Sequence, residues 1–198
     1  MPKSGQRSYT VPAMLLIIVV LATLIVILLT RLLVYQQASH TEEGKRLANR
    51  YNYCQMLASE LNAYAEDLLA SRTAADRLPA MQKVGVFQPA SGECSLLLYD
   101  AQVRSGADKD HALEPISLAL RKLGDALPKL GVHDGPLTEQ ETRTLQAIRD
   151  GSARMAEILK GYRLPTSDQN YRQMASGGAW VDLAKQALDQ LQRIAGAL

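Results

Sequence analysis

The sequence predicts an all-α protein in which a single transmembrane helix is followed by an antiparallel helical bundle. The first observation is the run from Ala13 to Thr30, which holds no charged residue and is apolar apart from two threonines. The second is that apolar residues recur at alternating spacings of three and four in four later segments, as in helices that pack side by side. The third is that no segment shows the sustained alternation of a half-buried strand.

Residues 11–35 form the predicted transmembrane anchor. A helix rises about 1.5 Å per residue, so a hydrocarbon layer of about 30 Å needs about 20 residues, which this run supplies. The apolar part of a signal peptide is shorter, at about 7–15 residues, and ends at a small-x-small cleavage site, which is missing after Tyr35. We therefore expect an uncleaved anchor. Arg31 and Tyr35 mark its outer boundary, because the guanidinium can reach the lipid headgroups from there.

The anchor separates an amino-terminal tail, residues 1–10, from a domain, residues 36–198. Basic residues flank the anchor on both sides, so the positive-inside rule hardly distinguishes the two orientations. A short amino-terminal tail is usually cytoplasmic, and long domains translocate largely regardless of their charge. We therefore expect a single-pass protein with a cytoplasmic tail and an extracytoplasmic domain.

Four segments of the domain carry the repeat of packed helices, and they lie at residues 47–68, 113–130, 141–159 and 180–198. Four such helices in one short chain favour an antiparallel bundle, whose helices cross at about 20°. In the first segment the repeating positions are Leu47, Tyr51, Cys54, Ala58, Leu61, Ala65 and Leu68.

Local signals indicate where these helices begin and end. Thr138 and Glu141 have the spacing of a capping box, Gly161 is placed as a helix stop, and Ser167 offers the next start. An irregular loop is expected over residues 72–93, which contain two prolines and two glycines in and around the stretch "MQKVGVF". Residues 94–103 are expected to be helical, with a short strand as the alternative.

The charge of the domain argues against nucleic acid as a partner. Of the 22 basic residues, 19 follow position 35, as do all 20 acidic residues, so the domain has a net charge of −1. Binding to nucleic acid depends on many basic contacts with phosphates. The net positive charge of the whole chain, +2, comes instead from the basic residues that flank the membrane anchor.

The two cysteines, Cys54 and Cys94, allow two interpretations. Outside the cytoplasm they could form a disulfide bond. Alternatively, they are two small buried apolar residues on helix faces. No histidines lie near them in a zinc-binding pattern, so we expect neither a metal site nor a cofactor.

No catalytic residues are expected. The three histidines lie far apart in the sequence, and none belongs to an HExxH motif; there is no Gly-x-Ser-x-Gly motif either. A nucleophile needs an adjacent base and an oxyanion site, and the sequence offers no such set. The chain is therefore expected not to be an enzyme.

The aromatic residues suggest an interface. Tyrosine occurs eight times, against one tryptophan and one phenylalanine, and tyrosine and tryptophan are favoured where one end of the side chain is apolar and the other is wet. The alternative is that these side chains border the bundle's own core. The candidate interface residues are Tyr51, Tyr64, Tyr162, Tyr171 and Trp180.

Two stretches of the domain resemble a known family. The first, residues 135–159, contains Pro136, Leu137, Glu139, Gln140 and Glu141, and the second, residues 178–188, contains Trp180, Asp182, Ala187 and Leu188. In these residues, and in the order of tail, anchor and helices, the chain resembles the amino-terminal region of YpeB-type spore-germination membrane proteins. Members of that family continue into carboxy-terminal PepSY repeats, which this sequence lacks. By this resemblance the chain would be a truncated form or a short relative.

The resemblance implies a non-enzymatic accessory protein of the spore inner membrane, needed for the stability or localisation of a cortex-lytic enzyme. Partner binding that belongs to the PepSY repeats does not transfer to this chain. The sequence thus favours an anchored scaffold in the inner membrane of a bacterial cell or spore, with the lipid bilayer and another envelope or membrane protein, such as a cortex-lytic hydrolase, as partners. The alternative is an extracytoplasmic ligand-sensing domain that acts with a separate signalling partner.

Overall fold

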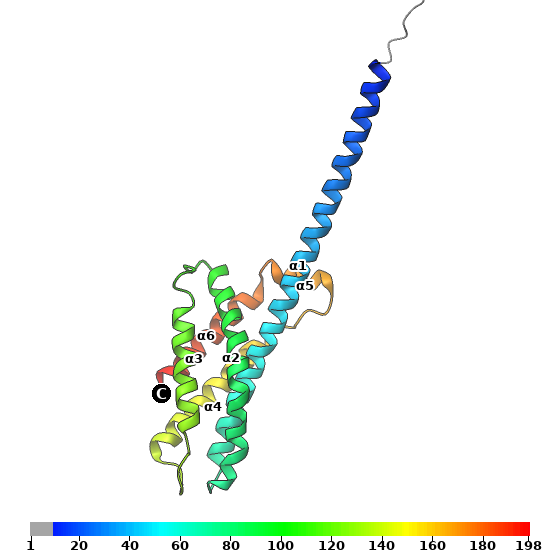
Figure 1. The fold of residues 1–198 in the computed structure, drawn as a ribbon. Coiled ribbons are helices and arrows are strands. Elements are labelled where there is room, and N and C mark those ends of the chain that lie inside the picture. Colours follow the sequence, from blue (N-terminus) through cyan, green and yellow to red (C-terminus); the bar gives the residue numbers. More distant parts are fainter. Residues whose placement is uncertain (1–9) are drawn as a thin grey trace, which may run out of the picture.

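The computed structural model describes residues 10–198 and confirms the all-α class, since this part of the chain contains no strand (Figure 1). The expected cytoplasmic tail, residues 1–10, lies outside the described residues except for Thr10, where the first helix begins. The six α-helices are α1 (Thr10–Ala70), α2 (Leu78–Arg104), α3 (Glu114–Ala126), α4 (Glu139–Lys160), α5 (Asp168–Ala175) and α6 (Ala179–Gly196). Two single-turn 3₁₀ helices, η1 (Ala75–Arg77) and η2 (Leu127–Lys129), adjoin α2 and α3.

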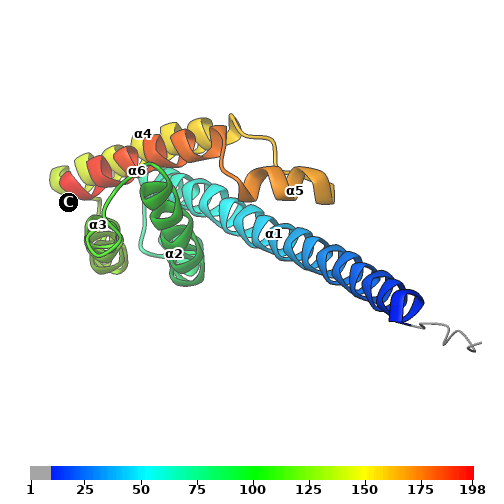
Figure 2. The same ribbon diagram turned by 90° about the horizontal axis from the view of Figure 1, so that it is seen from above.

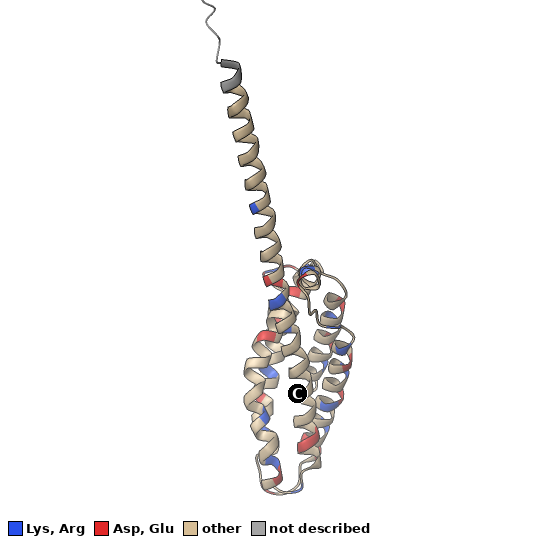
Figure 3. Ribbon diagram, turned by 90° about the vertical axis from the view of Figure 1, so that its right-hand side faces the viewer, with Lys and Arg blue, Asp and Glu red and all other residues tan. Residues whose placement is uncertain are grey.

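Helix α1 is continuous from the apolar segment into the centre of the bundle (Figures 1 and 2). Every residue from Met14 to His40 is exposed, and the apolar part of this stretch, residues 14–35, is here called the apolar arm. The arm is long and apolar enough to span a membrane. Its one basic residue is Arg31, whereas charged residues are distributed over the bundle (Figure 3). Arg31 and Tyr35 both lie on the exposed surface of the helix.

The other helices pack around the second half of α1. Helices α2, α4 and α5 contact α1 directly, while α6 packs against α4, α2 and α3 on the side away from α1. Short connections alternate the direction of successive long helices, which confirms the antiparallel bundle (Figure 1). The repeating positions predicted over residues 47–68 and 141–159 are all buried, whereas the prediction is wrong at Leu113 and Leu198, the ends of the other two segments, which are exposed.

The expected irregular loop over residues 72–93 is wrong from Leu78 onward, because α2 begins there and runs without interruption to Arg104. Pro79 occupies the first turn of α2, where no amide donor is needed. Pro89 lies inside the helix on its exposed side and costs α2 one internal hydrogen bond. The opposite side of α2 is buried in the core, and that burial outweighs the poor helix propensity. The buried residues of α2 are Ala80, Ala90, Cys94, Leu97, Leu98 and Ala101.

The predicted helix ends agree with the structure. The Thr138 side chain accepts a hydrogen bond from the Glu141 amide, and the Glu141 carboxylate accepts one from the Thr138 amide, which completes the capping box of α4. Gly161 caps the carboxy-terminal end of α4, and the Ser167 hydroxyl caps the start of α5. Residues 94–103 are helical, so the alternative of a short strand is excluded.

Candidate interaction surfaces

The core encloses three of the five aromatic residues that the sequence suggests as an interface. Tyr51 and Trp180 are fully buried and Tyr64 is 2% exposed, so these side chains serve the bundle's own core. Tyr51 and Tyr64 donate hydrogen bonds to the carbonyl oxygens of Leu159 and Leu127, at 2.9 and 2.6 Å. Burial raises the pKa of both phenols. The presence of a tyrosine in the sequence does not show whether its side chain lies in the core or at an interface. Both places suit a side chain with an apolar ring and a polar hydroxyl group.

The other two aromatic residues are partly exposed near the end of the bundle from which the arm emerges. The Tyr162 ring lies 5.3 Å from the Tyr51 ring, centroid to centroid, and partial burial raises the pKa of Tyr162. Tyr171 lies on α5, where its main chain contacts α1. Both residues are therefore partly buried side chains that border the core.

Cys54 and Cys94 form a disulfide bond that joins α1 to α2, with their Cα atoms 4.6 Å apart. Both residues are fully buried. Of the two interpretations of these cysteines, the structure thus has the disulfide, and it lies inside the core. Disulfide bonds persist in oxidising compartments, so this bond is compatible with an extracytoplasmic domain.

Helix α5 fastens α1 where the arm enters the bundle (Figure 2). Arg104 on α2 donates hydrogen bonds to the Glu43 carboxylate on α1, at 2.6 Å, and to the Ala175 carbonyl oxygen at the end of α5, at 2.8 Å. Its guanidinium also lies 5.7 Å from the centroid of the Trp180 ring on α6. One side chain therefore links four helices at the arm-proximal end of the bundle.

The contact between α1 and α5 depends on Gly44. A Cβ atom at this position would lie 1.9 Å from the Tyr171 carbonyl oxygen, a main-chain atom that can move only with α5 itself. Arg172 on α5 also donates a hydrogen bond to the Thr41 hydroxyl, at 3.2 Å. A Gly44→Ala variant should therefore lose about 2 kcal/mol of unfolding free energy through this overlap.

The expected result is faster amide hydrogen exchange over residues 168–175 in the Gly44→Ala variant, with little change in the rest of the bundle. Gly85→Ala is the matched control, since a Cβ atom at that helical glycine meets no atom within 4 Å. The control should gain about 0.5–1 kcal/mol from its better helix propensity. Equal exchange of α5 in both variants would show that α5 does not rely on the close approach at Gly44.

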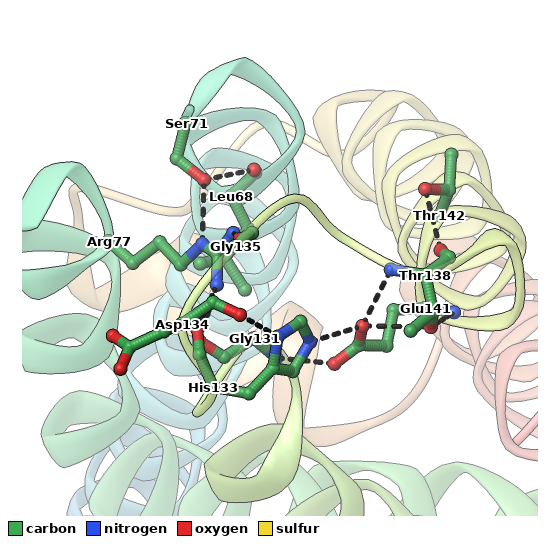
Figure 4. Close-up of polar contacts among 10 residues, drawn as sticks. All are labelled: Leu68, Ser71, Arg77, Gly131, His133, Asp134, Gly135, Thr138, Glu141 and Thr142. Carbon is green, nitrogen blue, oxygen red and sulfur yellow. Dashed lines mark hydrogen bonds and ion pairs between the residues drawn. The ribbon is translucent and has the colours of Figure 1, made fainter. Parts of the chain in front are cut away.

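At the opposite, arm-distal end, the loop of residues 131–137 lies between a buried cation and an anion (Figure 4). Arg77 is only 1% exposed and donates hydrogen bonds to the carbonyl oxygens of Gly131, His133 and Gly135. Glu141 accepts hydrogen bonds from the amides of Gly131 and Thr138, at 2.8 and 2.9 Å. The carbonyl oxygens of the loop thus accept hydrogen bonds from a guanidinium, and amides of the main chain donate hydrogen bonds to a carboxylate. Arg77 and Glu141 therefore hold the loop in place through its main-chain groups.

Glu141 also faces the imidazole of His133, whose Nε2 lies 2.8 Å from a carboxylate oxygen. The other ring nitrogen, Nδ1, faces the Asp134 carbonyl oxygen at 3.1 Å. Both neighbours are acceptors, so only the protonated ring can donate to both. The hydrogen bond to Glu141 is the main cause that raises the pKa of His133. Burial alone would raise the pKa of Glu141, but the bonds from His133, Thr138 and Gly131 together lower it to about 2.

This pair predicts a pH dependence of stability. Since the folded-state pKa of His133 is raised, the protonated pair stabilises the fold fully below the unfolded-state pKa of about 6.5, and this contribution is lost as the pH rises through the folded-state value. The difference in melting temperature between the wild type and a His133→Gln variant should therefore be larger at pH 5.5 than at pH 8.5. A His111→Gln control, at an exposed position, should show a smaller change with pH.

Hollows open on the surface of the bundle beside α3 and beside α5. The α3 groove consists of adjoining hollows of about 560 and 190 Å³ that share Lys122. Its floor includes Leu118, Ala119 and Leu130, and Lys129 adds a second basic group to the wall. In the core, by contrast, the space between Tyr64 and Phe87 is only about 10 Å³, which is about the volume that one water needs.

The hollow beside α5, here called the α5 hollow, has a volume of about 570 Å³ and lies between the connections that flank α5. Its wall is more polar and includes Arg163, Thr166, Asn170 and Gln173. Within residues 14–198, no three histidine, cysteine, aspartate or glutamate side chains lie close enough together to hold a metal ion. The walls of these hollows present both apolar and polar side chains to a ligand.

Comparison of the chain with protein-family models, with curated proteins and with solved structures gives no match. The resemblance to the amino-terminal region of YpeB-type proteins stays a prediction.

Proposed function

We propose that the protein is a non-enzymatic, single-pass membrane scaffold whose extracytoplasmic bundle binds another envelope protein through the α3 groove. The α3 groove carries this proposal, because it is an open concavity with a largely apolar lining on the surface of the bundle. Helix α3 is strongly amphipathic, so its exposed side is mostly polar, yet the apolar side chain of Leu118 is 46% exposed in the groove. Exposed apolar groups in a groove with polar borders are typical of protein-binding surfaces.

The walls of the α3 groove indicate the chemistry of the partner. Lys122 and Lys129 lie on α3 and η2, and Asp125 is the one acidic side chain that lines the groove. An amphipathic segment with an apolar face and an acidic border would satisfy both the floor and the two ammonium groups. By the resemblance to YpeB-type proteins, the candidate partner is a cortex-lytic hydrolase at the spore inner membrane.

The continuity of α1 supports a scaffolding role. From residue 36 to Ala70 the helix is about 50 Å long at 1.5 Å per residue. The disulfide bond and the α5 contacts fix the bundle to this helix at two heights. A partner held in the α3 groove would therefore stay at a defined distance from the membrane.

The compartment can be tested by labelling a single exposed cysteine. Ala153 is exposed on α4, whereas Cys54 and Cys94 are buried and paired. An Ala153→Cys variant of the full chain should react with a membrane-impermeant maleimide applied to intact cells, and the wild type should not. Labelling only after the cells are opened would place the bundle in the cytoplasm and contradict the proposal.

Partner binding can be tested by photo-crosslinking in native membranes. A photoreactive amino acid at Leu118 should capture one protein, and the capture should fall at least about tenfold in the Lys122→Glu, Lys129→Glu double variant if the partner segment is acidic. The same photoreactive residue at Gln146, on the exposed side of α4, is the matched control. Equal capture from both positions, or capture that ignores the charge reversal, would contradict a specific role of the α3 groove.

The α5 hollow supports the alternative of a ligand-sensing domain. It adjoins the helix that fastens α1, so a small molecule bound between Arg163 and Gln173 would contact the junction between bundle and arm. A compound that raises the melting temperature of the wild type, but not of an Asn170→Leu variant, would favour this alternative if Leu118 captures nothing.

A further inference from the structure

Between Leu78 and Leu96, the exposed residues of α2 are all uncharged, and the two charged residues, Lys83 and Glu93, are partly buried, with 29% and 43% of their side chains exposed. This composition is unusual for the surface of this bundle, because the exposed side of α4 carries six charged residues: Glu139, Arg143, Asp150, Arg154, Glu157 and Lys160. The exposed residues of α2 in this range are Leu78, Pro79, Gln82, Gly85, Val86, Gln88, Pro89, Gly92 and Leu96.

Six of these residues follow the alternating spacing of packed helices, and we call them the outer seam of α2. Since the buried residues of α2 lie on its other side, α2 has two such faces, and the bundle covers only one of them. Cβ atoms at Gly85 and Gly92 would meet nothing within 4 Å, so another helix can approach the main chain closely at these two positions. The outer seam consists of Leu78, Gln82, Gly85, Pro89, Gly92 and Leu96.

We propose that the outer seam of α2 packs against the outer seam of a second copy of this chain anchored in the same membrane. Helix α2 runs antiparallel to α1, so it has the same direction and the same height in every copy anchored by the arm (Figure 1). Two copies related by a two-fold axis along the membrane normal bring the two outer seams together as a parallel pair. Each seam residue then meets its own counterpart, because the two-fold axis runs between the two parallel helices, and the interface is closed.

The charges on α2 favour a second copy as the occupant. A parallel two-fold pair opposes identical residues, so any charge on the seam would meet a like charge, and the outer seam has none. The nearest charged residues of α2, Lys83 and Glu93, are paired within the same chain with Asp67 and Arg50. Two outer seams can therefore face each other without repulsion between like charges.

The size of the seam also favours a second anchored copy. From Leu78 to Leu96 the helix is about 28 Å long at 1.5 Å per residue, and a strip one helix wide falls short of the roughly 800 Å² per partner of a stable interface in solution. Anchoring in one membrane supplies a high effective concentration and a fixed orientation, so a smaller interface suffices. A partner that arrives from solution has neither advantage. This pairing rests on the membrane anchor of the proposed function, but it uses a different surface from the α3 groove and does not depend on partner binding there.

The proposal can be tested by disulfide crosslinking of the full chain in liposomes. In a Gln82→Cys variant the new cysteines of two copies face each other, so mild oxidation should give a covalent dimer at least about tenfold faster than in a Gln146→Cys control. The control residue is also an exposed helical glutamine, but it lies on α4. The native disulfide is fully buried and is not expected to exchange under these conditions.

A second substitution separates specific packing from random collision in the bilayer. Adding Leu96→Lys to Gln82→Cys brings two like charges together in the pair, and the crosslinking rate should fall to that of the control. Leu96 is 39% exposed, so the helical circular dichroism and the Trp180 fluorescence should not change. Equal rates for Gln82→Cys and Gln146→Cys, or a rate that Leu96→Lys does not reduce, would overturn the proposal.

Discussion

Removal of the disulfide bond, by the paired substitutions Cys54→Ala and Cys94→Ala, should lower the unfolding free energy of the bundle by about 4 kcal/mol. The two cysteines are 40 residues apart, so the bond closes a long loop in the unfolded chain and restricts its conformational freedom. Alanine is preferred to serine in this test, because both positions are fully buried and a hydroxyl group would need a partner there.

The measurement is urea unfolding of the full chain in detergent, followed by the fluorescence of Trp180. This is the single tryptophan of the protein, and it is fully buried in the bundle, so its emission reports the loss of the core. Each single substitution should cost as much as the pair, since either one removes the bond. A loss below about 1 kcal/mol would mean that the unfolded chain keeps α1 and α2 together without the bond.

The second large effect is expected at Arg77. An Arg77→Met variant keeps most of the apolar stem but leaves three carbonyl oxygens of the arm-distal loop without their donor, and it should lose about 3 kcal/mol. An Arg77→Lys variant should lose less, because an ammonium group can reach some of these acceptors but lacks the planar fork of a guanidinium.

Arg72→Met is the control for this effect, since Arg72 is exposed five positions earlier and its loss should change stability by less than about 0.5 kcal/mol. The loss at Arg77 should also appear locally, as faster proteolysis between Gly131 and Leu137. If the loop remained resistant to proteolysis while the unfolding free energy fell, the packing of the Arg77 side chain beside α2 would be its main contribution.

The repeat of apolar residues predicted most of the fold because it reports burial directly. Over residues 47–68 the core covers every position of the repeat, and the capping box at Thr138 marks the start of α4. The same method failed over residues 72–93, where Pro79 and Pro89 suggested a loop. A proline in the first turn of a helix, and another on its exposed side, are compatible with a helix that gains its stability from the opposite face.

The contacts that link distant parts of the chain left no local signal. Arg77 precedes α2 directly in the sequence, yet its acceptors lie more than fifty residues later, and nothing in its neighbours distinguishes it from a surface arginine. For the tyrosines, by contrast, the sequence contained a signal that was misleading. Their number suggested an interface, whereas the hydroxyl groups of Tyr51 and Tyr64 donate hydrogen bonds to carbonyl oxygens inside the bundle. The outer seam of α2 left no signal either, because the sequence predicts a loop over residues 72–93, and the seam residues share one face only in a continuous helix.

Helix α1 contains a single glycine, Gly44, and α5 covers it, so nothing between the arm and the bundle can serve as a flexible joint. The bundle must therefore lean whenever the membrane segment leans. Transmembrane helices tilt by about 20° on average, and a thinner bilayer increases the tilt. At that tilt, the far end of the rigid segment of α1 beyond the arm, which is about 50 Å long, would be displaced sideways by about 17 Å. Bilayer thickness would thus set how far from its own anchor, and how close to the lipid surface, this protein can reach.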